Sequence, residues 1–282
     1  MSRLLALFGL LLLGFVGSGA AHPATAAVDA AKLRVYAFNG FDALTLLPNP
    51  EYQADFEKGS VKGAAVTWMT KPKGTESKWP GPAKATVLTN LAAADIVFAS
   101  LHSADNIETS GGTYASALAL NEKPKDPSDS GWKLGLADFA ALRQQRGGSG
   151  LPRLFIVVGC STALKPEAAA KHGIDPKATI PGALGYSDGL PGRAYIGFDI
   201  PTTGVKGDSL VLWFLKMWTN DRPSGGYQTL GEVLKELGPI LKNFTSSGAK
   251  RPNLDPGAAN FLDNMVIVGD QELRFSDLMS GR

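Results

Sequence analysis

The chain has 282 residues, enough for one large domain or two small ones, and its charges nearly balance, with 28 Lys and Arg against 26 Asp and Glu. The resulting net charge of +2 gives no case for binding to nucleic acid or to an acidic membrane surface. A single cysteine, Cys160, excludes an internal disulfide, and no Cys/His cluster has zinc-site spacing. We therefore expect no cofactor and no metal, although a calcium ion on a surface loop stays open.

The first 26 residues have the three parts of a secretory signal peptide. A short basic region precedes an apolar run from Leu4 to Val16, and small residues end at Ala26. The apolar run is shorter than the ~20 residues that a membrane-spanning helix needs. We expect cleavage after Ala26, with a cut near Ala20 or Ala21 as the alternative. Residues 27–282 would then form one exported domain, periplasmic or extracellular, without a membrane span.

Apolar runs and helical spacing alternate along the first half of the mature chain. Strands are expected at Leu33–Phe38, at Ala64–Met69 and in the run that ends at His102. Helices are expected at Tyr52–Lys58, Ala83–Ala93 and Leu136–Gln145. Two stretches rich in turn-forming residues are expected to be loops: Lys71–Pro82 and Ser103–Trp132.

The second half continues the alternation. Strands are expected in the run from Leu154 to Cys160 and at Arg193–Phe198, Asn264–Val268 and Leu273–Phe275. Asp208 is the expected N-cap of an apolar helix that ends at Trp218, and Thr229 with Glu232 forms an expected capping box. Strands that alternate with helices predict an α/β fold with a mostly parallel, helix-covered sheet.

Two of the expected buried strands lead to residues that can carry out chemistry. His102 follows the run that begins at Asp95, and Cys160 follows the run that begins at Leu154. Open α/β sheets bind ligands at the carboxyl ends of their strands, where a thiol and an imidazole suffice for nucleophilic catalysis. The alternative is that Cys160 is a small buried hydrophobe and His102 a core residue. His172 is interpreted as a helix C-terminal residue.

Five segments occur in an order that is typical of one protein family. They are Asp95–His102, Val157–Thr162, Gly182–Asp199, Thr229–Leu234 and Val268–Leu273. In this order the chain resembles the caspase–gingipain clan of cysteine peptidases (clan CD, the caspase–hemoglobinase fold), which includes clostripain, separase and the CHAT domains. The resemblance extends from about Leu33 to Phe275.

The resemblance implies a three-layer α/β sandwich with a mostly parallel six-stranded sheet, and hydrolysis of peptide bonds. By position, Cys160 would be the nucleophile, and His102 would protonate the leaving amine. The backbone N–H groups of Cys160 and Ser103 would stabilise the oxyanion. Most active members have glycine where this chain has Ser103. Serine keeps the N–H donor but would be strained if the position required a positive φ.

Substrate preference would depend on one acidic residue. Members of the family that cut after basic residues often have an acid two residues before the cysteine, where this chain has Val158. Separase instead takes an acid from just after the next strand, and Asp199 stands near that place, so that it would select Arg or Lys. Asp208 is the competing candidate, although a role as helix N-cap explains it better.

The sequence therefore predicts an exported hydrolase, a cysteine endopeptidase with a Cys160–His102 dyad that acts on a peptide or protein substrate. The alternative, favoured by Ser103, is a catalytically inactive caspase-like fold that binds a peptide or protein. A third possibility is acyl transfer at the same dyad, such as transpeptidation or amide hydrolysis on a cell-wall peptide. The sequence leaves the oligomeric state open.

Overall fold

A computed structural model describes residues 33–40, 45–61, 63–71, 79–109, 112–126, 128–147, 151–164, 166–223, 225–246, 253–255 and 257–280. The expected signal peptide, residues 1–26, lies outside these ranges, as does most of the expected loop at Lys71–Pro82. Among the described residues, no helix combines the length and the apolar character that a membrane crossing requires.

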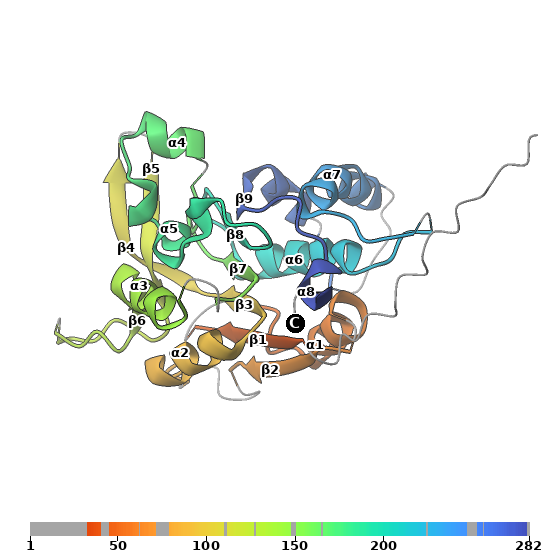
Figure 1. The fold of residues 1–282 in the computed structure, drawn as a ribbon. Coiled ribbons are helices and arrows are strands. Elements are labelled where there is room, and N and C mark those ends of the chain that lie inside the picture. Colours follow the sequence, from red (N-terminus) through yellow and green to blue (C-terminus); the bar gives the residue numbers. More distant parts are fainter. Residues whose placement is uncertain are drawn as a thin grey trace, which may run out of the picture.

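A six-stranded sheet with the order β2-β1-β3-β7-β8-β9 forms the centre of the fold (Figure 1). Its strands are β1 (Arg34–Asn39), β2 (Ala65–Met69), β3 (Ile96–Ser100), β7 (Leu154–Val158), β8 (Ala194–Phe198) and β9 (Met265–Gly269). All neighbouring pairs are parallel except β8 and β9, which are antiparallel. The predicted α/β class with a mostly parallel sheet is confirmed.

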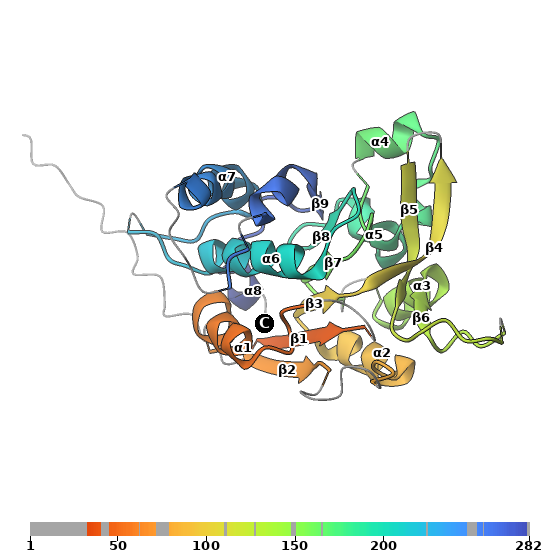
Figure 2. The same ribbon diagram turned by 180° about the vertical axis from the view of Figure 1, so that it is seen from behind.

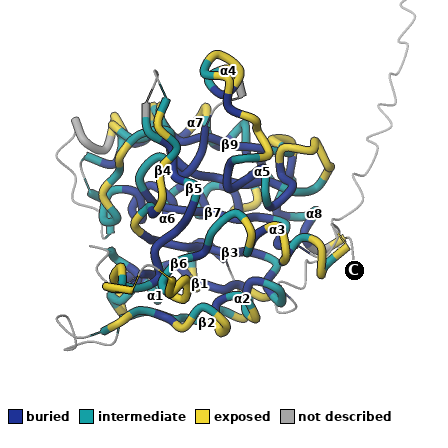
Figure 3. The backbone as a smooth tube through the Cα atoms, turned by 90° about the vertical axis from the view of Figure 1, so that its left-hand side faces the viewer, coloured by how far each residue is buried: buried dark blue, intermediate teal, exposed yellow. Residues whose placement is uncertain are grey.

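Helices pack on both faces of this sheet. One face is covered by α1 (Pro50–Asp55), α6 (Gly204–Trp218) and α7 (Leu230–Ser246). The other face is covered by α2 (Lys84–Ala93), α3 (Leu136–Gln145) and α5 (Ile180–Leu184). Successive side chains of a strand point to opposite faces, so the central strands are buried on both (Figure 3).

Shorter helical elements connect these layers. The α-helices are α4 (Pro166–Lys171) and α8 (Asp277–Ser280). One π-helical turn covers Phe56–Ser60, and 3-10 turns cover Pro176–Ala178, Tyr186–Asp188 and Ala258–Asn264.

The segment that was expected to be a loop, Ser103–Trp132, instead holds most of a second sheet. The strands β4 (His102–Thr109), β5 (Gly112–Ala119) and β6 (Lys133–Gly135) form an antiparallel three-stranded sheet. The β4–β5 hairpin stands at one end of the molecule, beside α4 (Figure 2). Residues of β4 are mostly exposed or half-buried, and a strand with a solvent-facing side can be polar. The polar composition of β4 is therefore the reason that the sequence predicts a loop here.

Two further boundaries differ from the prediction. The N-cap of α6 is Thr203, so Asp208 lies inside the helix and is fully buried rather than capping it. The expected strand at Leu273–Phe275 is reduced to an isolated bridge between Arg274 and Thr229. By contrast, the capping box is confirmed. Glu232 N donates to Thr229 Oγ1 at 3.1 Å, and Thr229 N donates to Glu232 Oε2 at 2.8 Å.

Gly207 allows α6 to lie directly on β7. A Cβ atom at this position would lie 2.3 Å from Cγ1 of Val158, the last residue of β7. We expect Gly207→Ala to lower the free energy of unfolding by about 1–3 kcal/mol, because overpacking a dense interior outweighs the better helix propensity of alanine. Chemical denaturation measures the change. Gly231→Ala is the control, since a Cβ there would lie 3.5 Å from its nearest neighbour; equal losses in both variants would contradict the prediction.

Candidate active site

The two strand ends that lead to His102 and Cys160 lie side by side. Strands β3 and β7 are neighbours, and Leu101 N donates to Val158 O at 2.9 Å. A Cβ on Gly159 would lie only 2.6 Å from Leu101 O, so these two backbones are in close contact. The next residue along each chain segment is His102 or Cys160. The structure therefore brings the two predicted residues to the same edge of the sheet.

Cys160 is half-buried, and its thiol points toward the segment between β8 and α6. Its Sγ–H donates to the carbonyl oxygen of Thr202 over a distance of 3.6 Å. The segment between β8 and α6 also contacts Ser161, the residue after Cys160, because Ser161 N donates to Ile200 O at 3.0 Å. Cys160 is therefore not fully buried, as the alternative of a small buried hydrophobe would require.

His102 is the first residue of β4, opposite Ala119 of β5, and it is exposed. The alternative that it is a core residue is thus wrong as well. Ser103 pairs with Leu118 in the same ladder, so both residues belong to the hairpin, and only Leu101 separates them from the end of β3.

Backbone strain lies after the cysteine and not after the histidine. Among the described non-glycine residues, a positive φ occurs at Asp105, Ser161 and Asn253, so Ser103 has no need of glycine. Ser161 has a φ of 51°, and its carbonyl accepts from Ala115 N at 3.0 Å. Strained residues that are over-determined by their contacts cluster at functional sites. Sequence reasoning missed this turn because serine seldom adopts a left-handed conformation.

Asp199, the predicted substrate-binding acid, comes directly after β8 and is half-buried. Its N–H donates to Asn264 O at 3.0 Å, and the next residue, Ile200, contacts Ser161. Burial, and then the nearby Asp199 carboxylate, raise the pKa of Tyr114 in β5 above its ordinary value. The structure thus places Asp199 beside the turn that follows the thiol. Tyr114 is a neighbour that the sequence did not indicate.

Asp208, the competing substrate-binding candidate, is enclosed. Its Oδ2 accepts from Thr45 Oγ1 at 2.5 Å and from Leu46 N at 2.7 Å. A fully buried carboxyl offers no surface to a substrate side chain, so Asp208 does not fill that role in this structure.

No protein-family model matches this chain, and no curated protein matches it significantly. Within the described ranges, no three His, Cys, Asp or Glu side chains gather closely enough to hold a metal ion.

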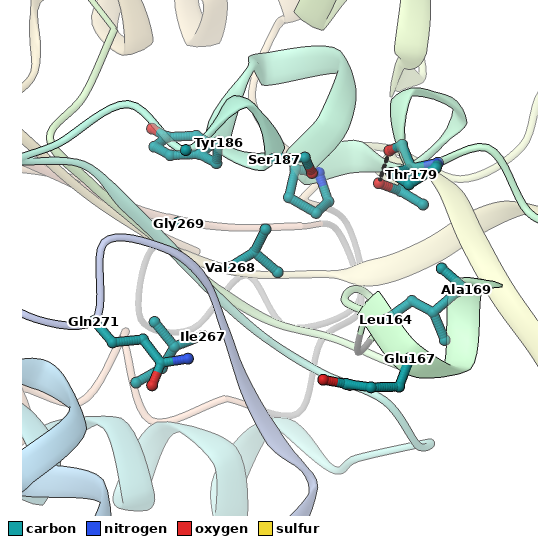
Figure 4. Close-up of a pocket in the computed structure, with 13 residues that line it drawn as sticks. Leu164, Glu167, Ala169, Thr179, Tyr186, Ser187, Ile267, Val268, Gly269 and Gln271 are labelled. Carbon is teal, nitrogen blue, oxygen red and sulfur yellow. Dashed lines mark hydrogen bonds between the residues drawn. The ribbon is translucent and has the colours of Figure 1, made fainter. Parts of the chain in front are cut away.

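A pocket of about 330 Å³ lies beside β9, a volume suited to a small ligand or a side chain. Figure 4 shows Ile267 and Val268 of β9 between Gln271 on one side and Leu164 with Glu167 on the other. Its lining includes none of the four residues predicted from the sequence as a site: His102, Ser103, Cys160 and Asp199. The pocket is therefore a separate feature of the molecule.

Proposed function

We propose that this chain is a cysteine endopeptidase in which Cys160 is the nucleophile and His102 the general acid. The proposal rests mainly on the close contact between the backbones of Leu101 and Gly159. A Cβ atom built on Gly159 would lie only 2.6 Å from the carbonyl oxygen of Leu101. This contact brings a thiol-bearing and an imidazole-bearing residue to adjacent strand ends. The mostly parallel six-stranded sheet, with helices on both faces, supports the caspase-like sandwich that the resemblance implies.

The proposed reaction has two stages. The Cys160 thiolate attacks the peptide carbonyl, the S–C bond forms, and backbone N–H groups of Cys160 and Ser103 stabilise the oxyanion. The C–N bond then breaks as His102 donates its proton to the leaving amine. In the second stage His102 takes a proton from water, whose oxygen attacks the thioester and releases the acid and the thiolate. The strained turn at Ser161 directly follows the proposed nucleophile.

The single cysteine makes a direct test possible, because an alkylating reagent modifies one thiol only. We expect the mature protein to cleave members of a diverse peptide library, and protein pretreated with iodoacetamide to lose this cleavage. Mass spectrometry identifies both the products and the labelled residue. A folded protein that cleaves no peptide, and whose thiol reacts no faster than that of an unstructured cysteine peptide, would refute the proposal.

Asp199 is the residue that we propose to select Arg or Lys before the cleaved bond. Because a charge-assisted hydrogen bond contributes about 1.5–3 kcal/mol, Asp199→Asn should lower kcat/KM for such substrates about 10- to 100-fold. Substrates with a neutral residue at that position should change little. The measurement compares two peptides that differ only there. Asp138→Asn, a partly exposed carboxyl in the first turn of α3, is the control. An unchanged preference in Asp199→Asn would exclude this role.

The pocket beside β9 favours a second candidate, a catalytically inactive fold that binds a peptide or protein. It provides about 330 Å³ of space without using the dyad. If the protein only binds peptides, we expect their affinity to stay unchanged after alkylation of Cys160, and we expect no cleavage products. Where products do form, their analysis separates hydrolysis from acyl transfer to a second amine.

A further inference from the structure

A buried polar cluster lies at the same edge of the sheet, on the face that α6 covers. Asn39 and Ser100 end β1 and β3 opposite one another, and both are fully buried. Ala37 and Phe98, two residues earlier on each strand, pack with α6, so the period of two places Asn39 and Ser100 on that face. Asp208 of α6 is also fully buried, and it lies near enough to Ser100 to be affected by its hydroxyl.

Both hydrogen bonds to the Asp208 carboxyl go to the same oxygen. Oδ2 accepts from Thr45 Oγ1 and Leu46 N, which belong to the segment between β1 and α1. Oδ1 and Ser100 Oγ are each buried without a well-formed hydrogen bond in the described part of the chain. The Ser100 hydroxyl can donate to Oδ1 or accept from a proton on Oδ1, while Oδ2 continues to accept from the segment.

The charges around Asp208 do not neutralise it. Tyr52 of α1 donates its hydroxyl to the Asp208 carbonyl oxygen at 2.8 Å. Burial raises the pKa of Tyr52 well above its ordinary value, so the phenol stays protonated. Asp55 of α1 pairs with Lys216 of α6 at 2.6 Å. Among the ion pairs of the described residues none includes Asp208, so an ionised carboxylate here would be a buried charge without a counter-ion.

This environment holds the proton on the acid into the neutral range. Burial raises the pKa of Asp208 from 3.8 to about 7, against the opposing effect of the hydrogen bonds from Thr45 and Leu46 and of the nearby Ser100 hydroxyl. Hydration would return the pKa toward its ordinary value, because water stabilises the ionised form. Any opening that exposes this carboxyl to water is therefore coupled to loss of its proton.

We propose that Asp208 is a proton-dependent clamp whose neutral carboxyl holds the Thr45–Leu46 segment against α6 and whose ionisation favours release of that segment. The seated form binds the proton more tightly than the released form. Seating is therefore strongest at low pH and weakens up to about tenfold per pH unit as pH rises from about 4 to 7. Above pH 7 the carboxyl is ionised in both forms, and no further weakening follows.

The clamp adjoins the candidate active site. Thr202, whose carbonyl oxygen lies 3.6 Å from Cys160 Sγ, precedes the first turn of α6, the helix that carries Asp208. In the chain, the clamped residues Thr45 and Leu46 come between β1 and α1, and β1 is the neighbour of β3 in the sheet. Release of the segment would therefore alter access to this edge as pH rises through neutrality. That regulation rests on the proposed function, whereas the clamp itself does not.

Hydrogen exchange at the Leu46 amide tests the clamp in the mature protein between pH 5 and 8. We expect its protection factor, corrected for the unstructured rate, to fall up to about a hundredfold from pH 5 to 7 and then to level off. Asp208→Asn should make the protection independent of pH, since the amide accepts and donates as the neutral acid does. Asp138→Asn should keep the wild-type dependence. A flat wild-type profile, or the same slope in Asp208→Asn, would overturn the proposal.

A second measurement needs no variant and so stays decisive if Asp208→Asn does not fold. The carbon-13 shift of the Asp208 carboxyl in the wild-type protein should titrate with a midpoint near pH 7. A midpoint below pH 5 would overturn the clamp. Neither experiment uses peptide cleavage. If Asp208 titrates as expected but the protein cleaves no peptide, the clamp is supported and the peptidase function is refuted. If the protein cleaves peptides but Asp208 titrates below pH 5, the clamp is refuted and the peptidase function is supported.

Discussion

Replacement of Cys160 by alanine should abolish peptide cleavage, and His102→Ala should lower kcat by about 10²- to 10⁴-fold. Alanine at position 160 removes the atom that attacks the carbonyl, whereas loss of the imidazole removes the proton transfer and leaves the thiol in place. The measurement is the single-turnover rate on the best peptide from the library.

His172→Ala is the matched control for the histidine variant. His172 is half-buried, and its backbone N–H donates to Ala168 O at the end of α4, so it has no expected part in the reaction. Thermal unfolding checks that all three variants are folded. Cleavage that persists in Cys160→Ala, or a loss in His172→Ala as large as that in His102→Ala, would remove the dyad from consideration.

Gly159→Ala should reduce cleavage by about 10²-fold, although it touches neither reacting side chain. The new Cβ would lie 2.6 Å from Leu101 O and 2.9 Å from Thr162 Cγ2. A backbone oxygen cannot swing aside as a flexible side chain does, so β3 and β7 must separate between the residues that precede His102 and Cys160. A displacement of about 1 Å between catalytic groups is enough for a loss of this size.

The stability of Gly159→Ala separates misplacement from unfolding. Overpacking is expected to cost about 1–3 kcal/mol in the free energy of unfolding, which leaves the variant folded at 25 °C if the parent has ordinary stability. Gly231→Ala, with ordinary contacts for its Cβ, should keep full activity. A folded Gly159→Ala variant with wild-type kcat/KM would show that the two strand ends need not be close.

The main sheet could be predicted because parallel strands that are covered on both faces are continuously apolar. Ile96–Ser100 and Leu154–Val158 have this pattern, and each leads to a predicted site residue. The β4–β5 hairpin could not be predicted in this way. Its first strand, β4, is mostly exposed or half-buried, so the polar residues of this strand have the composition of a loop.

Features that depend on contacts between residues far apart in the chain could not be predicted from the sequence. Asp208 has the local pattern of a helix cap, but α6 begins one turn earlier, and a segment more than 150 positions away in the chain encloses the carboxyl. The strained turn at Ser161 is fixed by Ile200 and Ala115, which belong to other elements. No local pattern in the sequence contains those partners.

Leu101 alone separates β3 from β4 and thus joins the two sheets through a single residue. Cys160 follows a strand with hydrogen-bonded neighbours on both sides, whereas His102 begins the hairpin. The relative placement of Cys160 and His102 consequently depends on how the two sheets are oriented to one another. The hydrogen bond from Ala115 N of β5 to Ser161 O joins the hairpin to the turn that follows Cys160. The hairpin therefore holds His102 and is also bonded to the residue after Cys160.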